Sequence, residues 1–292
     1  MNIRHNLCCI GYITQDKVVT PQSTIYMPGG TSFYFAHGIK HLSAEGFLLV
    51  TALADADMHV VEEIKKEGIE VKALHSNHSV CFENIYGENQ NERTQRVTAK
   101  ADPFTVEALK DISAKTIHLG TLLADDFSLE VIKFLSGKSL LSADVQGFLR
   151  KVDNEQVLPV DWPEKKEALK YIYTLKANEA EMEVLTGCTD PHEAALLIAD
   201  WGVKEVLLTL GDKGSLIYAS GQFYDIPAYP TLQVVDATGC GDTYMVGYLY
   251  MRNKGASYQE AGCFAAAMCT LKLQSHGPFR GTEAQVRSIT NM

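Results

Sequence analysis

Positive charge is scarce in this chain of 292 residues. Its 26 lysines and arginines are outnumbered by 36 aspartates and glutamates, which gives a formal net charge of −10 at pH 7. A protein that binds nucleic acid or an anionic membrane surface needs a basic balance, so we expect neither as a partner. A phosphorylated ligand, if the protein has one, must be held by local features of the chain.

Long apolar runs are missing as well. No stretch approaches the roughly 20 residues that span a bilayer, and the N-terminus lacks the layout of a signal peptide. The seven cysteines form no C-x-x-C pair, and several lie in apolar runs where a free thiol packs as a small hydrophobe. We therefore expect a protein of the cytoplasm with reduced thiols.

Sequence motifs for the two commonest nucleotide sites are also absent. No string fits the Walker pattern G-x-x-x-x-G-K-[S/T]. The Rossmann pattern G-x-G-x-x-G would need glycine at position 244, where Tyr244 stands. Residue identity excludes both sites.

The remaining composition is that of an ordinary globular protein, with 46% hydrophobic and 21% charged residues. The length admits two domains or one large α/β domain. Short apolar runs alternate with longer amphipathic stretches, which predicts β-α units around a largely parallel sheet. The predicted strands are residues 7–13, 47–51, 116–120, 140–144, 171–176 and 206–210.

Three capping patterns predict where helices begin. In each, a side chain that can cap a helix is followed three residues later by Glu or Gln. The pairs are Asp190 with Glu193, Ser257 with Glu260, and Thr282 with Gln285.

Two stretches, residues 17–27 and 71–100, break the alternation. Their β-branched and aromatic residues are interleaved with polar ones and show no helical period. We interpret them as antiparallel strands of a small sheet that stands off the main body. The alternative is that they are edge strands of the main sheet.

Residues 234–251 are the most informative segment. We expect a strand that ends at Val235, a glycine-rich turn, and a helix that begins near Gly241. Glycines at the start of a helix leave backbone N–H groups bare beside the positive end of the helix dipole, so the turn can hold an anion. Asp242 on the first helical turn is either a general base for an attacking hydroxyl or a capping carboxylate.

The segment from Asp236 to Asp242, D-A-T-G-C-G-D, resembles the C-terminal signature of the PfkB/ribokinase family of carbohydrate and nucleoside kinases, usually written D-[T/A]-x-G-A-G-D. The resemblance covers nearly the whole chain, because three further motifs follow the order of the family. They are Gly11-x-x-x-x-Asp16 with Gly29-Gly30, Asn178-x-x-Glu181, and Thr209-x-Gly211-x-x-Gly214. Four motifs in the right order are specific, whereas each alone is weak.

This resemblance implies an α/β fold: a ribokinase-like three-layer αβα sandwich with a small β-sheet lid over the acceptor. The family forms a single kinase domain, here residues 1–292, and the lid strands would come from about 12–28 and 71–100. Some members dimerise through lid strands, and an exposed sheet edge permits the same here.

The resemblance also implies catalytic roles. Asp242 would deprotonate the acceptor hydroxyl as it attacks the γ-phosphate of ATP. The amides of Gly239, Cys240 and Gly241 would form an anion hole for the transferring group. An alanine is usual at position 240, and a thiol at a helix N-terminus favours the thiolate.

ATP and metal sites follow from the same resemblance. Glu181 would hold Mg²⁺ through water, and the alternative for Asn178 with Glu181 is a helix start, which can coexist with that role. Asp236 would lie beside a monovalent cation that some members bind. The nucleotide would contact Asn178, Thr209, Gly211, Gly214, Ala266 and Gly277.

The acceptor would be bound by residues far apart in the chain. Asp16 would accept hydrogen bonds from hydroxyls, Gly29 and Gly30 would let the substrate approach the backbone, and Arg150 would meet an anion or form a surface ion pair. The family motif G-G-x-x-x-N places asparagine where this chain has Tyr34, which puts ribose in doubt and resembles the myo-inositol kinases.

We interpret the chain as an ATP-dependent kinase, a phosphotransferase with a hydroxyl of a sugar or cyclic polyol as acceptor. A nucleoside kinase is the nearest alternative, because Phe33, Phe35, Phe82 and Tyr86 offer aromatic surface for a base. A binding protein that senses sugars without catalysis is the alternative of another class. The intact Asp242 and glycine turn argue against it.

Overall fold

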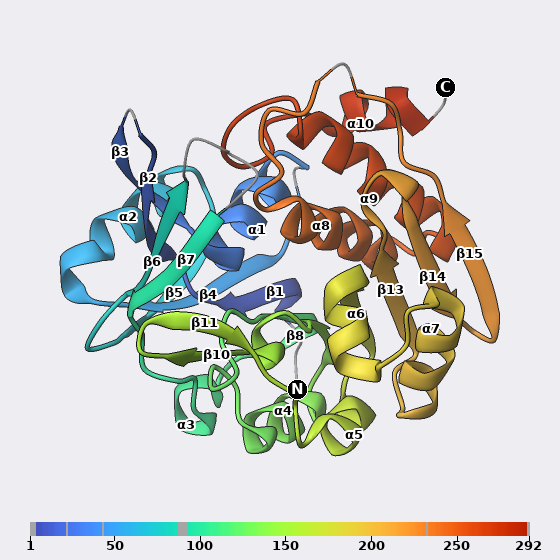
Figure 1. The fold of residues 1–292 in the computed structure, drawn as a ribbon, viewed down its shortest axis with the longest axis horizontal. Coiled ribbons are helices and arrows are strands. Elements are labelled where there is room, and N and C mark those ends of the chain that lie inside the picture. Colours follow the sequence, from blue (N-terminus) through green and yellow to red (C-terminus); the bar gives the residue numbers. More distant parts are fainter. Residues whose placement is uncertain (1–3, 22, 43, 87–92, 232, 291–292) are drawn as a thin grey trace.

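A mostly parallel sheet runs through the middle of the computed structural model, which describes residues 4–21, 23–42, 44–86, 93–231 and 233–290 (Figure 1). Within these ranges it has nine strands, and all pair in parallel except β14, which is antiparallel to both β13 and β15. In spatial order the strands are β15 (Gln222–Ile226), β14 (Ser215–Ala219), β13 (Glu205–Thr209), β12 (Thr174–Asn178), β9 (Leu140–Asp144), β8 (Ala114–Gly120), β1 (His5–Gly11), β4 (Phe47–Leu53) and β5 (Glu70–His75).

Helices cover both faces of this sheet, which confirms the expected three-layer αβα sandwich. Side chains alternate between the faces along β1: Leu7 and Cys9 pack with one helical layer, and Cys8 and Ile10 with the other. The first layer contains α1 (Gly30–Lys40), α2 (Met58–Lys66), α8 (Cys240–Asn253) and α9 (Tyr258–Lys272), with α10 (Glu283–Thr290) on α9. The second contains α3 (Val106–Leu109), α4 (Leu129–Ser136), α5 (Lys165–Ala168), α6 (Glu179–Thr186) and α7 (Pro191–Asp200).

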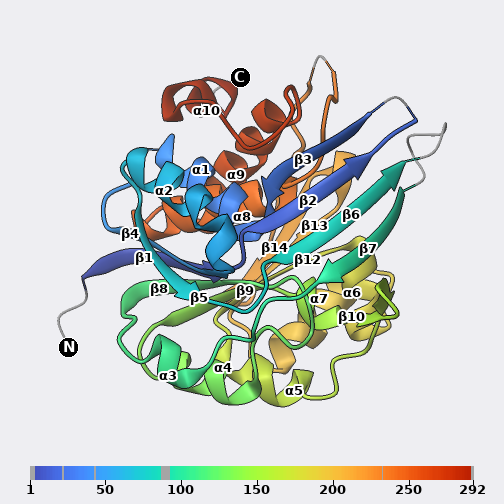
Figure 2. The same cartoon turned by 90° about the vertical axis from the view of Figure 1, so that its left-hand side faces the viewer.

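A second sheet stands off one side of the sandwich, as Figures 1 and 2 show. Its six strands within the described residues are, in order, β10 (Arg150–Asp153), β11 (Gln156–Pro159), β7 (Arg93–Ala99), β6 (Val80–Tyr86), β2 (Thr14–Val19) and β3 (Thr24–Gly29). We call these strands the lid. The prediction of a separate small sheet is therefore confirmed for most of both stretches; residues 22 and 87–92 lie outside the described ranges. The predicted antiparallel pairing is only partly right, because β2 pairs antiparallel with β3 and β6 with β7, but β2 and β6 are parallel.

One predicted lid boundary is wrong, and one hairpin of the lid was missed. Residues 71–75 belong to β5, the edge strand of the main sheet, where they pair in parallel with β4. The hairpin β10–β11 was not predicted, although it completes the lid. Its turn residues Asn154 and Glu155 both have positive φ, as a two-residue type I′ turn requires, but Glu is an unusual residue there.

The segment before α8 also differs from expectation. Val235 does not end a strand; it lies in a loop, and its amide donates to the carbonyl of Leu273 at 2.7 Å. The capping predictions are confirmed: Asp190 caps α7, and Ser257 forms a capping box that starts α9. At the start of α10 the Thr282 hydroxyl accepts from the Gln285 amide.

Parallel strands bring their carboxyl ends to one edge of the main sheet. The ends of β9, β12 and β13 place Asp144, Asn178 and Thr209 there, next to the first turn of α8. Ligands of open α/β sheets bind at this edge. All seven cysteines are free thiols, and none of the helices in the described ranges combines the length and the apolar composition of a membrane span.

Candidate active site

The N-terminus of α8 is the centre of the candidate site. Gly239 caps the helix in the left-handed conformation, with φ of 75°, and turns the chain so that the first amides face outward. Of the three amides expected to form an anion hole, that of Cys240 donates to the carbonyl of Ala237 at 3.2 Å. Among the described residues no hydrogen bond engages those of Gly239 and Gly241, which leaves two donors for an anion.

Asp242 lies on the first turn of α8. Burial and the nearby carboxylate of Asp144 raise its pKa to about 6, although Lys176 and a hydrogen bond from the Thr31 hydroxyl oppose the shift. No described first-turn amide donates to its carboxylate, so it does not cap the helix. A carboxylate with a pKa near neutrality is suited to accept a proton.

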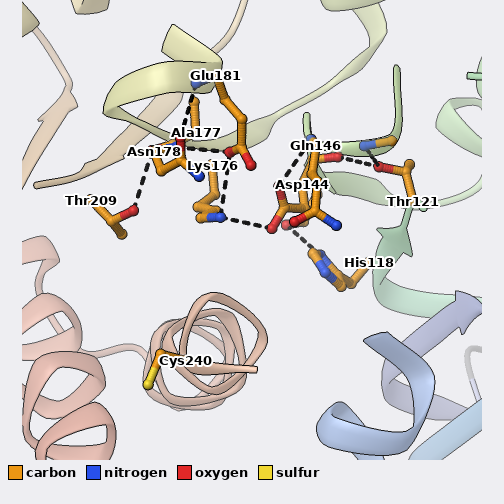
Figure 3. A network of polar contacts seen from close by, with 12 residues as sticks. His118, Thr121, Asp144, Gln146, Lys176, Ala177, Asn178, Glu181, Thr209 and Cys240 are labelled. Atoms are coloured by element: carbon orange, nitrogen blue, oxygen red, sulfur yellow. Dashed lines mark hydrogen bonds and ion pairs between the residues drawn. The ribbon is translucent and has the colours of Figure 1, made fainter. Parts of the chain in front are cut away.

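A buried ion-pair network faces this turn (Figure 3). The Lys176 ammonium lies 2.9 Å from Asp144 Oδ2 and 3.6 Å from Glu181 Oε2, and all three residues are buried. Lys176 and Asp144 are register partners on β12 and β9, which fixes their contact. A Cβ on Gly241 would lie 2.9 Å from Lys176 Nζ, so glycine is what allows the ammonium to reach the helix.

Lys176 was not among the predicted site residues. A lysine within a buried strand is rarely expected, because long charged side chains are mostly exposed. Although burial opposes it, Asp144 and Glu181 raise the pKa of Lys176, so the side chain stays charged. The available signal was its position two residues before Asn178, at the end of a strand that reaches the site.

Asn178 and Glu181 form a capping box at the start of α6, as the structural alternative held. Asn178 Oδ1 accepts from the Glu181 amide at 2.9 Å, and Glu181 Oε2 accepts from the Asn178 amide at 2.8 Å. Glu181 Oε1 is buried and has no partner. This free carboxylate oxygen fits the expected contact to a hydrated Mg²⁺, while no described cluster of three His, Cys, Asp or Glu side chains is arranged to bind a metal directly.

Tyr34 packs directly on the glycine turn. A Cβ on Gly239 would lie only 2.2 Å from Tyr34 Cδ1. Burial raises the pKa of the Tyr34 phenol, and so do the charges of Asp236, Asp16 and Asp242, so side chains from two sequence motifs converge on this ring. The structure thus brings Tyr34 to the turn that carries the base.

Asp16 and the paired glycines join the lid to α1. Asp16 lies on β2 and accepts a hydrogen bond from the Thr14 hydroxyl at 2.6 Å. A Cβ on Gly29 would lie 2.5 Å from Asp16 Oδ2, and Gly30 starts α1 with φ of 82°. Arg150 starts β10, and its charge lowers the pKa of the buried Glu181 carboxyl against the larger effect of burial.

The predicted nucleotide residues lie on three connections. Thr209 ends β13 as the register partner of Asn178, and the turn from Gly211 to Gly214 joins β13 to β14. A Cβ on Gly214 would meet Ile226 O at 2.1 Å, so this glycine is needed by the turn itself, whereas Gly211 faces open space. Ala266 is buried in α9, and Gly277 lies in the loop after it.

The oxygens of Asp236 are bound by a lysine side chain. The buried Lys272 ammonium donates to Asp236 O at 2.7 Å and lies 3.1 Å from Asp236 Oδ2. These oxygens are the ones Asp236 could offer to a monovalent cation. The residues present therefore do not fit such an ion.

Two of the aromatic residues considered for a nucleoside base lie in the core. Phe35 is fully buried between α1 and the sheet, and Phe82 is buried in the other core cluster. Phe33 is partly buried and contacts Tyr34 and His37, and the side chain of Tyr86 lies outside the described part of the structure. The aromatic argument for a nucleoside is weakened.

Replacement of Gly239 by alanine tests the contact with Tyr34. The new Cβ would collide with the ring and occupy a left-handed position, so we expect the turn to shift by about 1 Å and kcat/KM to fall on the order of 10²-fold. Gly187→Ala, just after α6, is the matched control, because its φ of 77° is close to that of Gly239 but its Cβ meets nothing within 4 Å. The kcat/KM of both variants is measured by steady-state kinetics. Equal losses of kcat/KM would contradict the collision with Tyr34 as the cause.

The raised pKa of Asp242 predicts a pH dependence. Below about pH 6 the carboxyl is protonated and cannot act as a base, so kcat/KM should fall as the pH falls through this value. Lys176→Met removes a positive charge and should move this limb to higher pH, whereas Asp144→Asn removes a negative charge and should move it lower. If the fall of kcat/KM at low pH occurs at the same pH in both variants, a group other than Asp242 causes it.

Known proteins resemble this chain in sequence and in fold. Residues 4–284 match the pfkB family carbohydrate kinase profile. Ribokinase from Arabidopsis thaliana is 37% identical over 124 residues, 40% of this chain and 33% of that protein. Cytidine kinase from Thermococcus kodakarensis is 35% identical over 97 residues, 32% of this chain and 34% of that protein. The chain matches about a third of the length of these curated relatives.

Solved structures match over almost the full length. A pyrophosphate-dependent kinase in the ribokinase family, complexed with a pyrophosphate analog and myo-inositol, is 29% identical with a TM-score of 0.87, covering 97% of this chain and 100% of that chain. Ribokinase from Thermotoga maritima has a TM-score of 0.78 at 17% identity, covering 99% and 100%, and shows the fold alone. With the four sequence motifs gathered at one edge of a ribokinase fold, the chain belongs to the pfkB family of carbohydrate kinases.

Proposed function

We propose that this protein transfers the γ-phosphate of ATP to a hydroxyl of a cyclic polyol similar to myo-inositol. The observation that carries the proposal is the convergence at the start of α8 of a carboxylate base, two open amides and a buried ammonium. Asp242 supplies the base, Gly239 and Gly241 the amides, and Lys176 the ammonium. These are the groups that an in-line phosphoryl transfer needs.

In the proposed mechanism the acceptor hydroxyl lies against Asp242, which takes its proton as the oxygen attacks phosphorus. The amides of Gly239 and Gly241 and the Lys176 ammonium stabilise the charge on the transferring phosphoryl group. Mg²⁺, held through water by Glu181 and with Asn178 beside it, would supply further neutralisation of the phosphates. Three carboxylates and one ammonium face this space, an excess of negative charge that a divalent cation complements.

Tyr34 and Asp16 support a polyol as the acceptor. Asp16 offers a carboxylate to hydroxyl donors, and Tyr34 offers an aromatic face and a phenol in place of the asparagine of ribokinases. The relative with 29% identity and nearly full coverage was solved with myo-inositol. Arg150 would then face the donor phosphates near Glu181.

Pyrophosphate is the second candidate for the phosphoryl donor. The relatives at 28–29% identity that cover nearly all of this chain are described as pyrophosphate-dependent. A compact donor needs only the anion hole and Lys176. A nucleotide would also use the turn at Gly211, which faces open space, and the region of Thr209, Ala266 and Gly277.

A substrate panel tests the reaction. Inositols, sugars and nucleosides are each offered with ATP and with pyrophosphate, and phosphorylated product is measured by mass spectrometry. We expect a cyclic polyol to react. Reaction of nucleosides alone would contradict the polyol assignment, and binding of sugars without turnover would support a non-catalytic sensor.

Asp242→Asn tests the catalytic base. Loss of the proton acceptor should lower kcat about 10²–10⁴-fold with the fold intact. Asp225→Asn on the exposed edge of β15 is the matched control and should keep full activity. Unchanged turnover in the Asp242 variant, with an unchanged circular dichroism spectrum, would refute the mechanism.

We also propose a homodimer through the lid. β3 is an edge strand of the lid, and its residues Ile25 and Tyr26 are 53% and 73% exposed. Such an edge can pair with another copy. The double variant I25K/Y26K should be a monomer in light scattering, while Val184→Lys on α6, which replaces another exposed apolar residue, should stay dimeric. A monomeric wild type would contradict the proposal.

A further inference from the structure

Lys272 is a buried lysine that the proposed mechanism does not use. It lies at the last residue of α9, and its side chain has no exposed surface. A buried ammonium is stable only when it is paired and hydrogen-bonded. The groups that contact the Lys272 ammonium therefore indicate the role of its charge.

Both partners of this ammonium belong to Asp236. Nζ donates to the backbone carbonyl of Asp236 at 2.7 Å and lies 3.1 Å from Oδ2 of the same residue. The carboxylate has two further hydrogen bonds, one local and one to the loop after α9: Oδ1 accepts from the Thr238 amide at 2.8 Å, and Oδ2 accepts from the Gly277 amide at 3.2 Å. Burial opposes ionisation, but these bonds and Lys272 hold the pKa of Asp236 below its usual range.

This pair holds the loop that leads into α8. Asp236 lies three residues before Gly239, and the Val235 amide donates to the carbonyl of Leu273, the residue after Lys272. The end of α9 is thus tied to the start of the glycine turn at two successive positions. The charge of Lys272 also reaches the turn, because it adds to the hydrogen bond with Cys269 that lowers the pKa of the Cys240 thiol.

We propose that the Lys272 ammonium is a built-in monovalent cation, which fixes and neutralises the loop before the anion hole and makes the protein independent of potassium. A carbonyl oxygen and a carboxylate oxygen are what such a hard cation would bind. Here the cation is attached to the protein and is always present. Lys272 is a positioning residue, since it acts through Asp236 and not on the substrate.

The experiment removes the charge of Lys272 and keeps most of the packing of its side chain. Lys272→Met retains most of the aliphatic stem and removes the ammonium. Thermal unfolding and turnover are measured in KCl and in tetramethylammonium chloride at equal ionic strength. The wild type should give the same midpoint and rate in both salts.

The variant should become dependent on potassium. In tetramethylammonium chloride its midpoint should fall by on the order of 10 °C, because Asp236 is left partly buried without its cation. Added KCl or NH₄Cl should restore much of the midpoint and of the rate, with saturation. A wild type that needs KCl, or a variant that responds equally to both salts, would overturn the proposal.

Two further variants separate this effect from general damage. Lys72→Met removes a partly buried ammonium that also donates to a backbone carbonyl, that of Ala108, and should give equal midpoints in both salts. The double variant Lys272→Met with Asp236→Asn removes both charges and should also be indifferent to KCl; a KCl response in it would contradict the role of Asp236. The rate readout rests on the proposed function, whereas the unfolding midpoint decides the inference even if no donor supports turnover.

Discussion

The site depends on buried carboxylates at the start of α8 whose negative charge is partly neutralised by one lysine. Asp144, Glu181 and Asp242 lie close together in a largely buried space; besides burial, Asp144 raises the pKa of both Glu181 and Asp242, and Glu181 raises that of Asp242 further. The Lys176 ammonium offsets part of this repulsion and keeps Asp144 paired. Burial, together with the negative charge that Lys176 leaves uncompensated, raises the pKa of Asp242. In the proposed mechanism the same imbalance would prepare the base and attract a metal ion.

Two buried lysines flank the glycine turn from different parts of the fold. Lys176 comes from β12 of the sheet and lies against Gly241, whereas Lys272 comes from the end of α9 and holds Asp236. One lies where the incoming phosphates would be, and the other lies behind the loop. If the proposed function holds, this placement is how a chain with a net charge of −10 would bind a polyanion locally.

Much of the fold and of the site could be predicted from the sequence, because the signals involved are local. Capping pairs, the alternation of strands and helices, and the glycine turn before Asp242 depend on neighbouring residues. Lys176 and Lys272 could not be found in this way, since their burial and pairing are set by packing between distant segments. The hairpin β10–β11 was missed because Glu155 gives no turn signal, and 71–75 was misassigned because an edge strand of either sheet has the same alternation.

The space left by the two glycines of the turn determines which side chains can approach it. A Cβ on Gly241 would come within 2.9 Å of the Lys176 ammonium and displace it, and Tyr34 can pack on the turn only because Gly239 has no Cβ. The two glycines thus admit a cation on one side and an aromatic ring on the other, while their own amides stay open to an anion. A side chain at either position would displace one wall of the site. The glycines of the motif are therefore required by the neighbours they admit as much as by the phosphate that their amides can bind.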